Sequence, residues 1–168
     1  MKPLPYGITD FVDVIKNYYY IDKTKFIHDI EKMGSFIYLI RPRRFGKSLF
    51  LNMLDFYYNI KYKDEFDLLK DCYIYKNPTP LKNSFHILKF NFSAVSTKGD
   101  VDNNFSEYCN RKIQKFLDEY NFNIVIDEQK PAHSNLDFVF QALTQNYPHT
   151  QIYILIDEYD NFINDLLV

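Results

Sequence analysis

The sequence predicts an α/β fold in which helices cover a mainly parallel sheet. Two short continuous apolar runs, residues 36–40 and 152–156, are typical of strands buried on both faces. A further strand is predicted at residues 85–92, between these two runs in the sequence. Helices are predicted at 47–60, 101–120 and 134–147, the first two from apolar residues that recur at helical spacing. Strands that alternate with helices favour a three-layer sandwich of the P-loop NTPase type, with helices on both faces of a parallel sheet.

The N-terminal part, residues 1–34, is predicted as a lead-in segment followed by one helix. Residues 1–21 form the entry segment, which ends just after an aromatic run at 18–20. Residues 24–33 are expected to be helical, with Phe26, Ile27 and Ile30 on one side. Gly34 is a plausible C-terminal stop for that helix.

The connections between the longer elements are predicted from turn residues and caps. A short helix is expected around residues 65–70, followed by a loop that contains Pro78 and Pro80. Residues 121–133 are a connection of mixed character. Ser134 and Asp137 have the spacing of a capping box, so the helix that follows should begin at residue 134.

The composition is that of an ordinary globular protein without a targeting or membrane segment. The chain has 168 residues, a hydrophobic fraction of 46% and a net charge of −2, so no global field attracts it to nucleic acid or an anionic membrane. Its two cysteines, Cys72 and Cys109, have no metal-binding or redox spacing and suit a reducing cytoplasm. The start of the chain lacks the apolar region of a secretory signal, and no apolar run is long enough to span a bilayer.

An arginine-rich loop lies between the predicted strand at 36–40 and the predicted helix at 47–60. It fits the phosphate-binding (Walker A) pattern G-x-x-x-x-G-K-[ST], except that arginine replaces the first glycine. A glycine lets the backbone approach phosphates, the following lysine reaches the β- and γ-phosphates, and the serine hydroxyl ligates Mg²⁺. The start of the helix adds backbone N–H donors for an anion. We therefore predict that nucleotide binds at Arg41, Pro42, Arg43, Arg44, Phe45, Gly46, Lys47, Ser48 and Leu49.

Two acids follow the last predicted strand and match the Walker B pattern. An acid at the C-terminal end of a buried strand can hold the hydration shell of Mg²⁺, and we assign Asp157 to this role together with Ser48. Glu158 would polarise the attacking water as a general base, so Lys47 and Glu158 are the predicted catalytic residues. Seen alone, the pair could also be a solvated acidic turn. Asp160 is better explained as a helix cap than as support for the site.

Four segments of the chain, in order, resemble a known family: residues 6–11, 20–24, 41–48 and 155–160. The chain is similar to the AAA-ATPase-like domain that often precedes a PD-(D/E)XK nuclease-like domain in bacterial proteins. In that family the form R-P-R-R-F-G-K-S of the loop is usual. The resemblance implies binding of ATP and Mg²⁺, with Lys47, Ser48, Asp157 and Glu158 in the roles given above. For the segment at 22–24 the resemblance implies less, and two roles are open. One is packing near the nucleotide base, and the other is helix entry through Asp22 or Thr24.

The resemblance also implies that the P-loop domain continues beyond this sequence. P-loop ATPases with a catalytic glutamate usually order their strands 5-1-4-3-2, and no sequence follows residue 168 to form strands 4 and 5. We therefore expect residues 1–168 to be one incomplete domain, truncated after the Walker B strand, which is either the N-terminal piece of a longer protein or a truncated gene product. Exposed strand edges would then favour association, either as a homo-oligomer or with a downstream nuclease-like domain.

Three functions are consistent with these residues. The first is an ATPase that hydrolyses ATP with Mg²⁺ to drive or regulate a downstream domain. The second is a nucleotide-binding switch that does not hydrolyse. The third is an interaction module whose arginines bind phosphates or nucleic acid. The two acids at 157–158 favour the ATPase, since a plain phosphate-binding patch does not need them, and any link to nucleic acid would be indirect.

Overall fold

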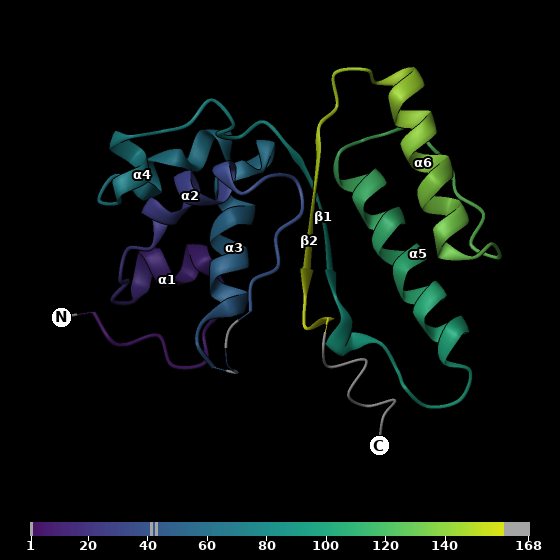
Figure 1. The fold of residues 1–168 in the computed structure, drawn as a ribbon, viewed down its shortest axis with the longest axis horizontal. Coiled ribbons are helices and arrows are strands. Elements are labelled where there is room, and N and C mark those ends of the chain that lie inside the picture. Colours follow the sequence, from purple (N-terminus) through teal and green to yellow (C-terminus); the bar gives the residue numbers. More distant parts are fainter. Residues whose placement is uncertain (1, 41, 43, 160–168) are drawn as a thin grey trace. The chain divides into compact units, whose positions relative to one another are not determined.

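A computed structural model describes residues 2–40, 42 and 44–159. The chain divides into two units, Met1–Phe85 and His86–Val168. Helices make up the ordered elements of the first unit, and the second combines two parallel strands with two long helices (Figure 1). The predicted α/β class is confirmed.

The first unit is built around one central helix, α3 (Lys47–Tyr58), in which seven of 12 residues are buried. The ring of Phe56 on α3 packs against Phe11 at a centroid distance of 5.6 Å and stacks on Tyr62 at 4.8 Å. These aromatic contacts join α3 to elements before and after it in the chain. The other elements of this unit are α1 (Phe11–Asn17), η1 (Thr24–Phe26), α2 (Ile27–Lys32), η2 (Ile60–Leu69) and α4 (Tyr73–Lys76).

The prediction for residues 24–33 is confirmed by η1 and α2, and that for 47–60 by α3. Helix α1 was not predicted and lies within the expected entry segment. Asp10 caps it, since its side chain accepts a hydrogen bond of 2.9 Å from the backbone N–H of Asp13. In place of the short helix expected at 65–70, a longer 3₁₀ segment, η2, spans residues 60–69.

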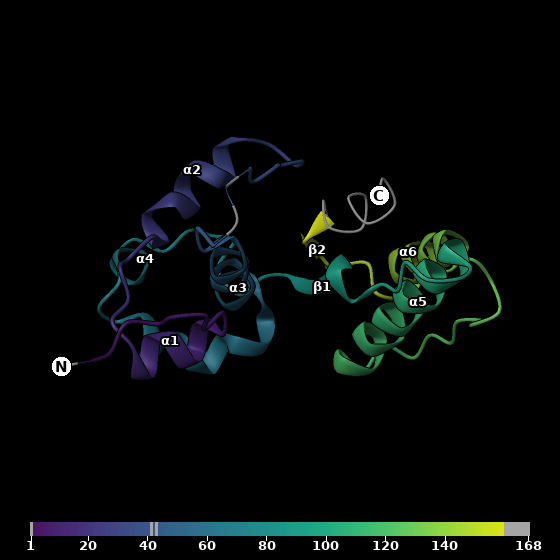
Figure 2. The same cartoon turned by 90° about the horizontal axis from the view of Figure 1, so that it is seen from below.

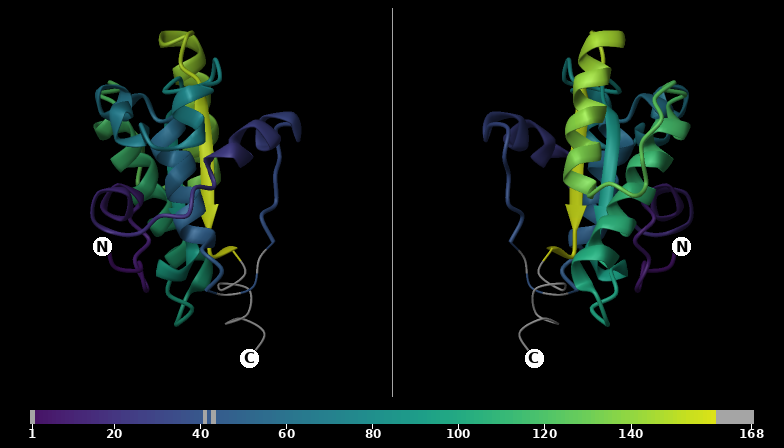
Figure 3. Two further views of the ribbon diagram at one scale, coloured as in Figure 1. Left: turned by 90° about the vertical axis from the view of Figure 1, so that its left-hand side faces the viewer. Right: turned by 90° about the vertical axis from the view of Figure 1, so that its right-hand side faces the viewer.

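The predicted buried strand at residues 36–40 is wrong. The segment is not part of a strand, and Phe36, Tyr38 and Ile40 are 91%, 80% and 82% exposed. Figure 3 shows it as a plain trace that leaves α2 and runs to the loop ahead of α3. A strand needs a neighbour to pair its N–H and C=O groups, and the described part of the first unit offers only an isolated bridge, between Asn59 and Phe85.

The second unit contains β1 (His86–Asn91) and β2 (Ile152–Asp157), which pair in parallel. The register runs from His86 opposite Ile152 to Asn91 opposite Asp157. Between the strands the chain passes through η3 (Phe92–Ala94), α5 (Val101–Glu119) and α6 (Ala132–Asn146), and both long helices lie on the same side of the two-stranded sheet (Figures 1 and 2). The predictions for 85–92 and 101–120 are confirmed. Residues 152–156 form the predicted strand, but burial on both faces is wrong, because Ile154 and Ile156 are 41% and 44% exposed.

The core of the second unit lies between this sheet and α5 and α6. Two tyrosines link α5 to β1 through their hydroxyl oxygens. Tyr108 accepts a hydrogen bond of 2.8 Å from the backbone N–H of Asn91, and Tyr120 accepts one of 2.8 Å from that of Ile87. These bonds satisfy backbone donors that the described neighbouring strand does not reach, so α5 fixes the position of β1.

Helix α6 begins at Ala132, two residues before the predicted start, and the capping box is wrong. The carbonyl of Pro131 accepts the N–H groups of Ser134 and Asn135, at 3.0 and 3.2 Å. The side chain of Asn135 is buried and donates to Asn110 Oδ1 at 3.0 Å and to the Asp127 carbonyl at 2.8 Å. This tertiary network fixes the start of the helix more strongly than the local capping pattern does.

Within the described ranges, no helix combines the length and the apolar composition needed to cross a membrane.

Candidate nucleotide-binding site

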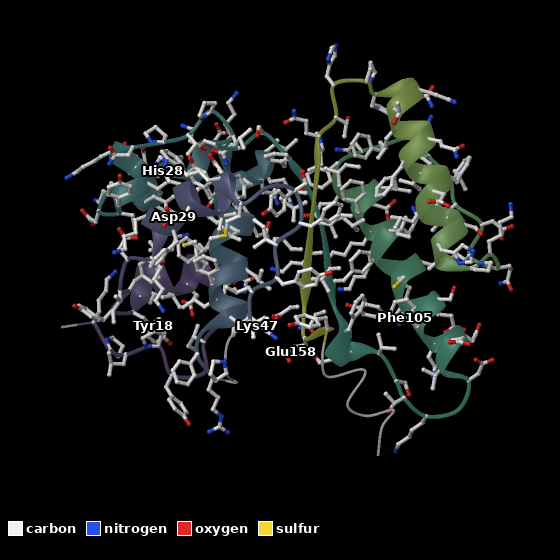
Figure 4. All side chains as sticks on the ribbon, in the orientation of Figure 1. Tyr18, His28, Asp29, Lys47, Phe105 and Glu158 are labelled. Atoms are coloured by element: carbon white, nitrogen blue, oxygen red, sulfur yellow. The ribbon has the colours of Figure 1, made fainter. Side chains whose placement is uncertain are left out.

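The predicted phosphate loop leads directly into the N-terminus of α3. Gly46 precedes the helix with φ 75° and ψ 26°, a left-handed conformation that glycine adopts without steric cost. The first hydrogen bond of the helix runs from Phe50 N–H to the Gly46 carbonyl, at 3.0 Å. The N–H groups of Lys47, Ser48 and Leu49 come before that donor, where a helix offers no acceptor of its own and its dipole favours an anion. Lys47 lies in this first turn of α3 (Figure 4).

The loop ahead of Gly46 is curled by a second left-handed residue, Arg44, at φ 66°. The N–H of Phe45 donates to the Pro42 carbonyl at 3.3 Å, which closes a short turn. Arg44 and Phe45 are exposed, and Lys47 and Ser48 are half-buried. The predicted ligands Arg41 and Arg43 lie outside the described residues.

The two predicted acids stand at the end of β2. Asp157 is the last residue of the strand and is 5% exposed, and its Oδ1 accepts a hydrogen bond of 2.9 Å from the backbone N–H of Glu158. Glu158 is half-buried and adopts φ 51°, so the chain turns sharply there (Figure 4). Asp160 lies outside the described residues.

Backbone strain marks both segments of the predicted site. Four residues other than glycine have positive φ in the described part of the chain: Arg44, Asn83, Asn121 and Glu158. Asparagine tolerates this conformation, but for arginine and glutamate it costs roughly 1–2 kcal/mol. Such strain occurs preferentially at functional sites. No sequence pattern reports it, because it is a property of the folded backbone.

The two predicted metal ligands, Ser48 and Asp157, both carry oxygen donors. The described residues contain no group of three or more His, Cys, Asp and Glu side chains that could hold a metal. Mg²⁺ commonly takes only one or two carboxylates from the protein and the rest of its ligands from phosphates and water. Ser48 in the first unit carries a hydroxyl and Asp157 in the second carries a carboxylate, and each is an oxygen ligand of the type that Mg²⁺ accepts.

The segment at 22–24 has a structural role at helix entries. Asp22 Oδ1 accepts hydrogen bonds from the backbone N–H and the hydroxyl of Thr24, at 2.8 and 2.7 Å. Asp22 Oδ2 accepts one of 2.7 Å from Tyr73 N–H, and Thr24 Oγ1 accepts one of 3.2 Å from Ile74 N–H. Both acceptors therefore tie the start of η1 to the first N–H groups of α4, the helix-entry role anticipated for Asp22 and Thr24.

A glycine, lysine and serine ahead of a helix and an acid at the end of a parallel strand are typical of nucleotide-binding, ATPase-like proteins. The chain belongs to the family described as "Predicted AAA-ATPase", whose model matches residues 5–168.

One curated protein is similar to part of the chain. It is described as "Uncharacterized protein in vnfD 5'region", from Azotobacter chroococcum mcd 1, and is 49% identical over 55 residues. The alignment covers 32% of this chain and 11% of that protein, so the chain spans only a small part of its relative's length. No solved structure matches the chain.

Proposed function

We propose that this protein binds Mg-ATP and hydrolyses it to drive or regulate a further domain. The observation that carries the proposal is the left-handed Gly46 placed directly before Lys47 and Ser48 at the start of α3. This arrangement presents backbone N–H groups, an ammonium group and a hydroxyl to one anion. Membership of the family supports the assignment of that anion as ATP.

The proposed residues act on the nucleotide in three ways: they bind the phosphates, hold the metal ion and activate the attacking water. Residues 41–49 surround the phosphates, and Lys47 neutralises charge on the β- and γ-phosphates. Ser48 and Asp157 hold Mg²⁺, which supplies charge neutralisation when it is bound. Glu158 accepts a proton from the attacking water as general base. These roles require both segments to act on the same nucleotide, within a three-layer sandwich in which helices cover both faces of the sheet.

Binding is tested by thermal unfolding with and without Mg-ATP. At about 100 times the dissociation constant, ATP should stabilise the wild-type protein by about 2.7 kcal/mol, visible as a rise of a few degrees in Tm. Lys47→Ala should lose this rise. Lys63→Ala, which removes an exposed lysine from η2 in the same unit, should keep it. A wild-type protein that is folded and shows no rise would contradict the proposal.

Hydrolysis is tested separately, by phosphate release. Glu158→Gln keeps the size of the side chain but removes the base, so it should retain the Tm rise and lose turnover by at least about 100-fold. Binding without turnover in the wild-type protein would instead identify a nucleotide-dependent switch.

A further inference from the structure

A cluster of cations lies on helix α5 in the second unit. Arg111, Lys112 and Lys115 fall within five consecutive residues of the helix, and no acid lies among them. Arg111 and Lys115 are exposed, Lys112 is half-buried, and Lys89 of the strand β1 adds a fourth positive charge near Lys112. We propose that this basic cluster binds the phosphate backbone of a nucleic-acid duplex, as a second anion site separate from the proposed nucleotide site.

Helical spacing brings the three cations of α5 together. Lys115 follows Arg111 by four residues and Lys112 by three, and side chains at both spacings are neighbours on the surface of a helix. Burial lowers the pKa of Lys112, and the positive charges of Lys115, Lys89 and Arg111 lower that pKa further. Like charges at this spacing destabilise a helix, and an anion bound among them would relieve the repulsion.

Lys112 lacks an acidic neighbour along the helix, since neither acid is found three or four residues before or after it. The acids of α5 nearest to the cluster on the C-terminal side are Asp118 and Glu119, which lie at these spacings from Lys115. Asp118 Oδ1 accepts a hydrogen bond of 2.8 Å from Gln114. The acids of this end therefore leave the charge at Lys112 to an external anion.

On the N-terminal side, Glu107 pairs only weakly with Arg111. Their charged atoms are 4.0 Å apart, and the two side chains are 56% and 67% exposed. Glu107 Oε1 also accepts a hydrogen bond of 2.9 Å from Asn103. An exposed pair of this kind contributes little to stability, so a phosphate can take the place of Glu107 beside the guanidinium group at small cost.

The contacts of Lys112 fix its position relative to β1. Its Nζ lies 5.4 Å from the centroid of the Tyr108 ring, and the Tyr108 hydroxyl accepts a hydrogen bond of 2.8 Å from the backbone N–H of Asn91. Lys89 precedes Asn91 by two residues on the same strand. The cation–π contact orients the ammonium group without neutralising its charge, which lowers the entropic cost of binding an anion there.

The extent of the cluster fits a row of phosphates. Residues 111–115 span about 6 Å of helix, and duplex DNA carries one negative charge per about 1.7 Å of its axis, so several phosphates come within reach. The neighbouring rings of Tyr108 and Phe116 are 5% and 2% exposed, so they offer no surface on which an unpaired base could stack. We therefore expect contact with a duplex through its backbone, without sequence preference. This contact is direct, unlike the indirect link to nucleic acid expected from the sequence.

The test measures how salt weakens the binding of a fluorescein-labelled DNA duplex to the whole chain, by fluorescence anisotropy. Each phosphate contact contributes about 0.9 to the slope of log K against log[salt]. With four contacts, the affinity of the wild type should fall about 150-fold between about 50 and 200 mM salt. With Arg111, Lys112 and Lys115 all replaced by alanine, one contact remains and the fall should be about threefold.

The matched control is Lys63→Ala/Lys70→Ala/Lys76→Ala, which removes three exposed lysines of the first unit and changes the net charge equally. It should keep the salt dependence of the wild type. Lys47→Ala should also bind the duplex as the wild type does, which separates the basic cluster from the phosphate loop.

Arg111→Ala/Lys115→Ala replaces only exposed side chains, so it should leave the fold intact, which circular dichroism checks. In this variant the affinity should fall about 12-fold over the same range of salt, since two contacts remain. No binding of the duplex by the wild type at low salt, or the wild-type salt dependence in the triple variant, would overturn the proposal. So would loss of binding in Lys47→Ala. Displacement of the duplex by an equal concentration of polyglutamate would show that an acidic protein segment fits the cluster equally well, and would overturn it too.

Discussion

Replacing Glu158 by alanine and by glycine separates the backbone role of this residue from its carboxylate. Both replacements remove the proposed general base, so both should abolish turnover. They differ only in the backbone, which at φ 51° is left-handed. Alanine keeps the steric conflict between Cβ and the backbone, which costs roughly 1–2 kcal/mol, and glycine removes it. Glycine loses about 0.5–1 kcal/mol of this advantage, because its unfolded chain is more flexible. We expect Glu158→Gly to be more stable than Glu158→Ala by roughly 0.5–1 kcal/mol.

Glu107 provides the matched control, because the same pair of replacements should there have the opposite effect. It lies within α5, where glycine is less favourable than alanine by about 1 kcal/mol. Its carboxylate pairs with Arg111 at 4.0 Å and accepts a hydrogen bond of 2.9 Å from Asn103. Both replacements lose these contacts equally, so they cancel in the comparison. The difference between alanine and glycine should therefore change sign between positions 107 and 158.

The four variants are compared by urea denaturation followed by far-ultraviolet circular dichroism, with the transition midpoint and slope fitted for each. A difference of 1 kcal/mol corresponds to several degrees in Tm for a unit of this size, so heating provides a second measurement. The reasoning is refuted if Glu158→Ala is as stable as Glu158→Gly while the pair at 107 behaves as expected. That result would mean that position 158 carries no left-handed strain in solution.

Two further predictions concern contacts outside the proposed catalytic residues. Asp22→Ala should lower the free energy of unfolding by about 2–3 kcal/mol, because Tyr73 N–H and the buried Thr24 lose a charged acceptor. The control is Asp64→Ala on an exposed part of η2, which should change the free energy of unfolding by less than about 0.5 kcal/mol in the same urea experiment. Burial lowers the pKa of His86 below its usual value of 6.5, against a smaller opposing effect of a backbone hydrogen bond, so the folded state binds fewer protons than the unfolded state. The resulting stability is present above pH 6.5 and is lost as the pH falls through the lowered pKa, and His86→Phe should reduce the loss between pH 7.5 and 5.5.

Either prediction can fail clearly. Equal losses in Asp22→Ala and Asp64→Ala would show that the bonds to α4 contribute little. The control for the pH experiment is His133→Phe, which replaces an exposed histidine of α6 in the same unit and should keep the wild-type dependence. An unchanged pH dependence in His86→Phe would remove His86 as its cause.

The long helices and two of the three strands could be predicted because their signals are local and repeated. In α3 and α5 the apolar residues recur over several turns, and the buried faces follow that period. Helix α1 has only seven residues, too few for the period to be distinct, and it depends on the cap at Asp10. The apolar run at 36–40 has the composition of a strand, but composition cannot specify a pairing partner. The capping pattern at Ser134 does not show the bonds of the neighbouring Asn135, whose side chain contacts Asn110 on α5, 25 residues away, as well as the nearby loop at 127–130.

The residue types of the candidate site can be read from the sequence, whereas its backbone conformations cannot. The order glycine, lysine, serine is typical of a phosphate loop, because each residue type has a chemical role there. A cavity in the first unit, lined by Pro5, Tyr19 and Gly46, was not predictable, since its three lining segments are separated by 14 or more positions in the sequence. The roles of Asp22 and Thr24 likewise became clear only from their bonds to α4, some fifty residues further along the chain.

The left-handed positions of the chain give one more reason to place function at both segments. Elsewhere in the described residues the sequence meets this backbone conformation with glycine or asparagine, the residues that adopt it most easily. It departs from that rule at Arg44 and Glu158, where the side chain adds strain that glycine would relieve. A side chain that costs stability at such a position is expected to contribute something else, and such departures occur preferentially at functional sites. Arg44 lies within the predicted phosphate loop and Glu158 follows the strand-end Asp157, so the proposed ATP hydrolysis gives both side chains a role that glycine could not fill.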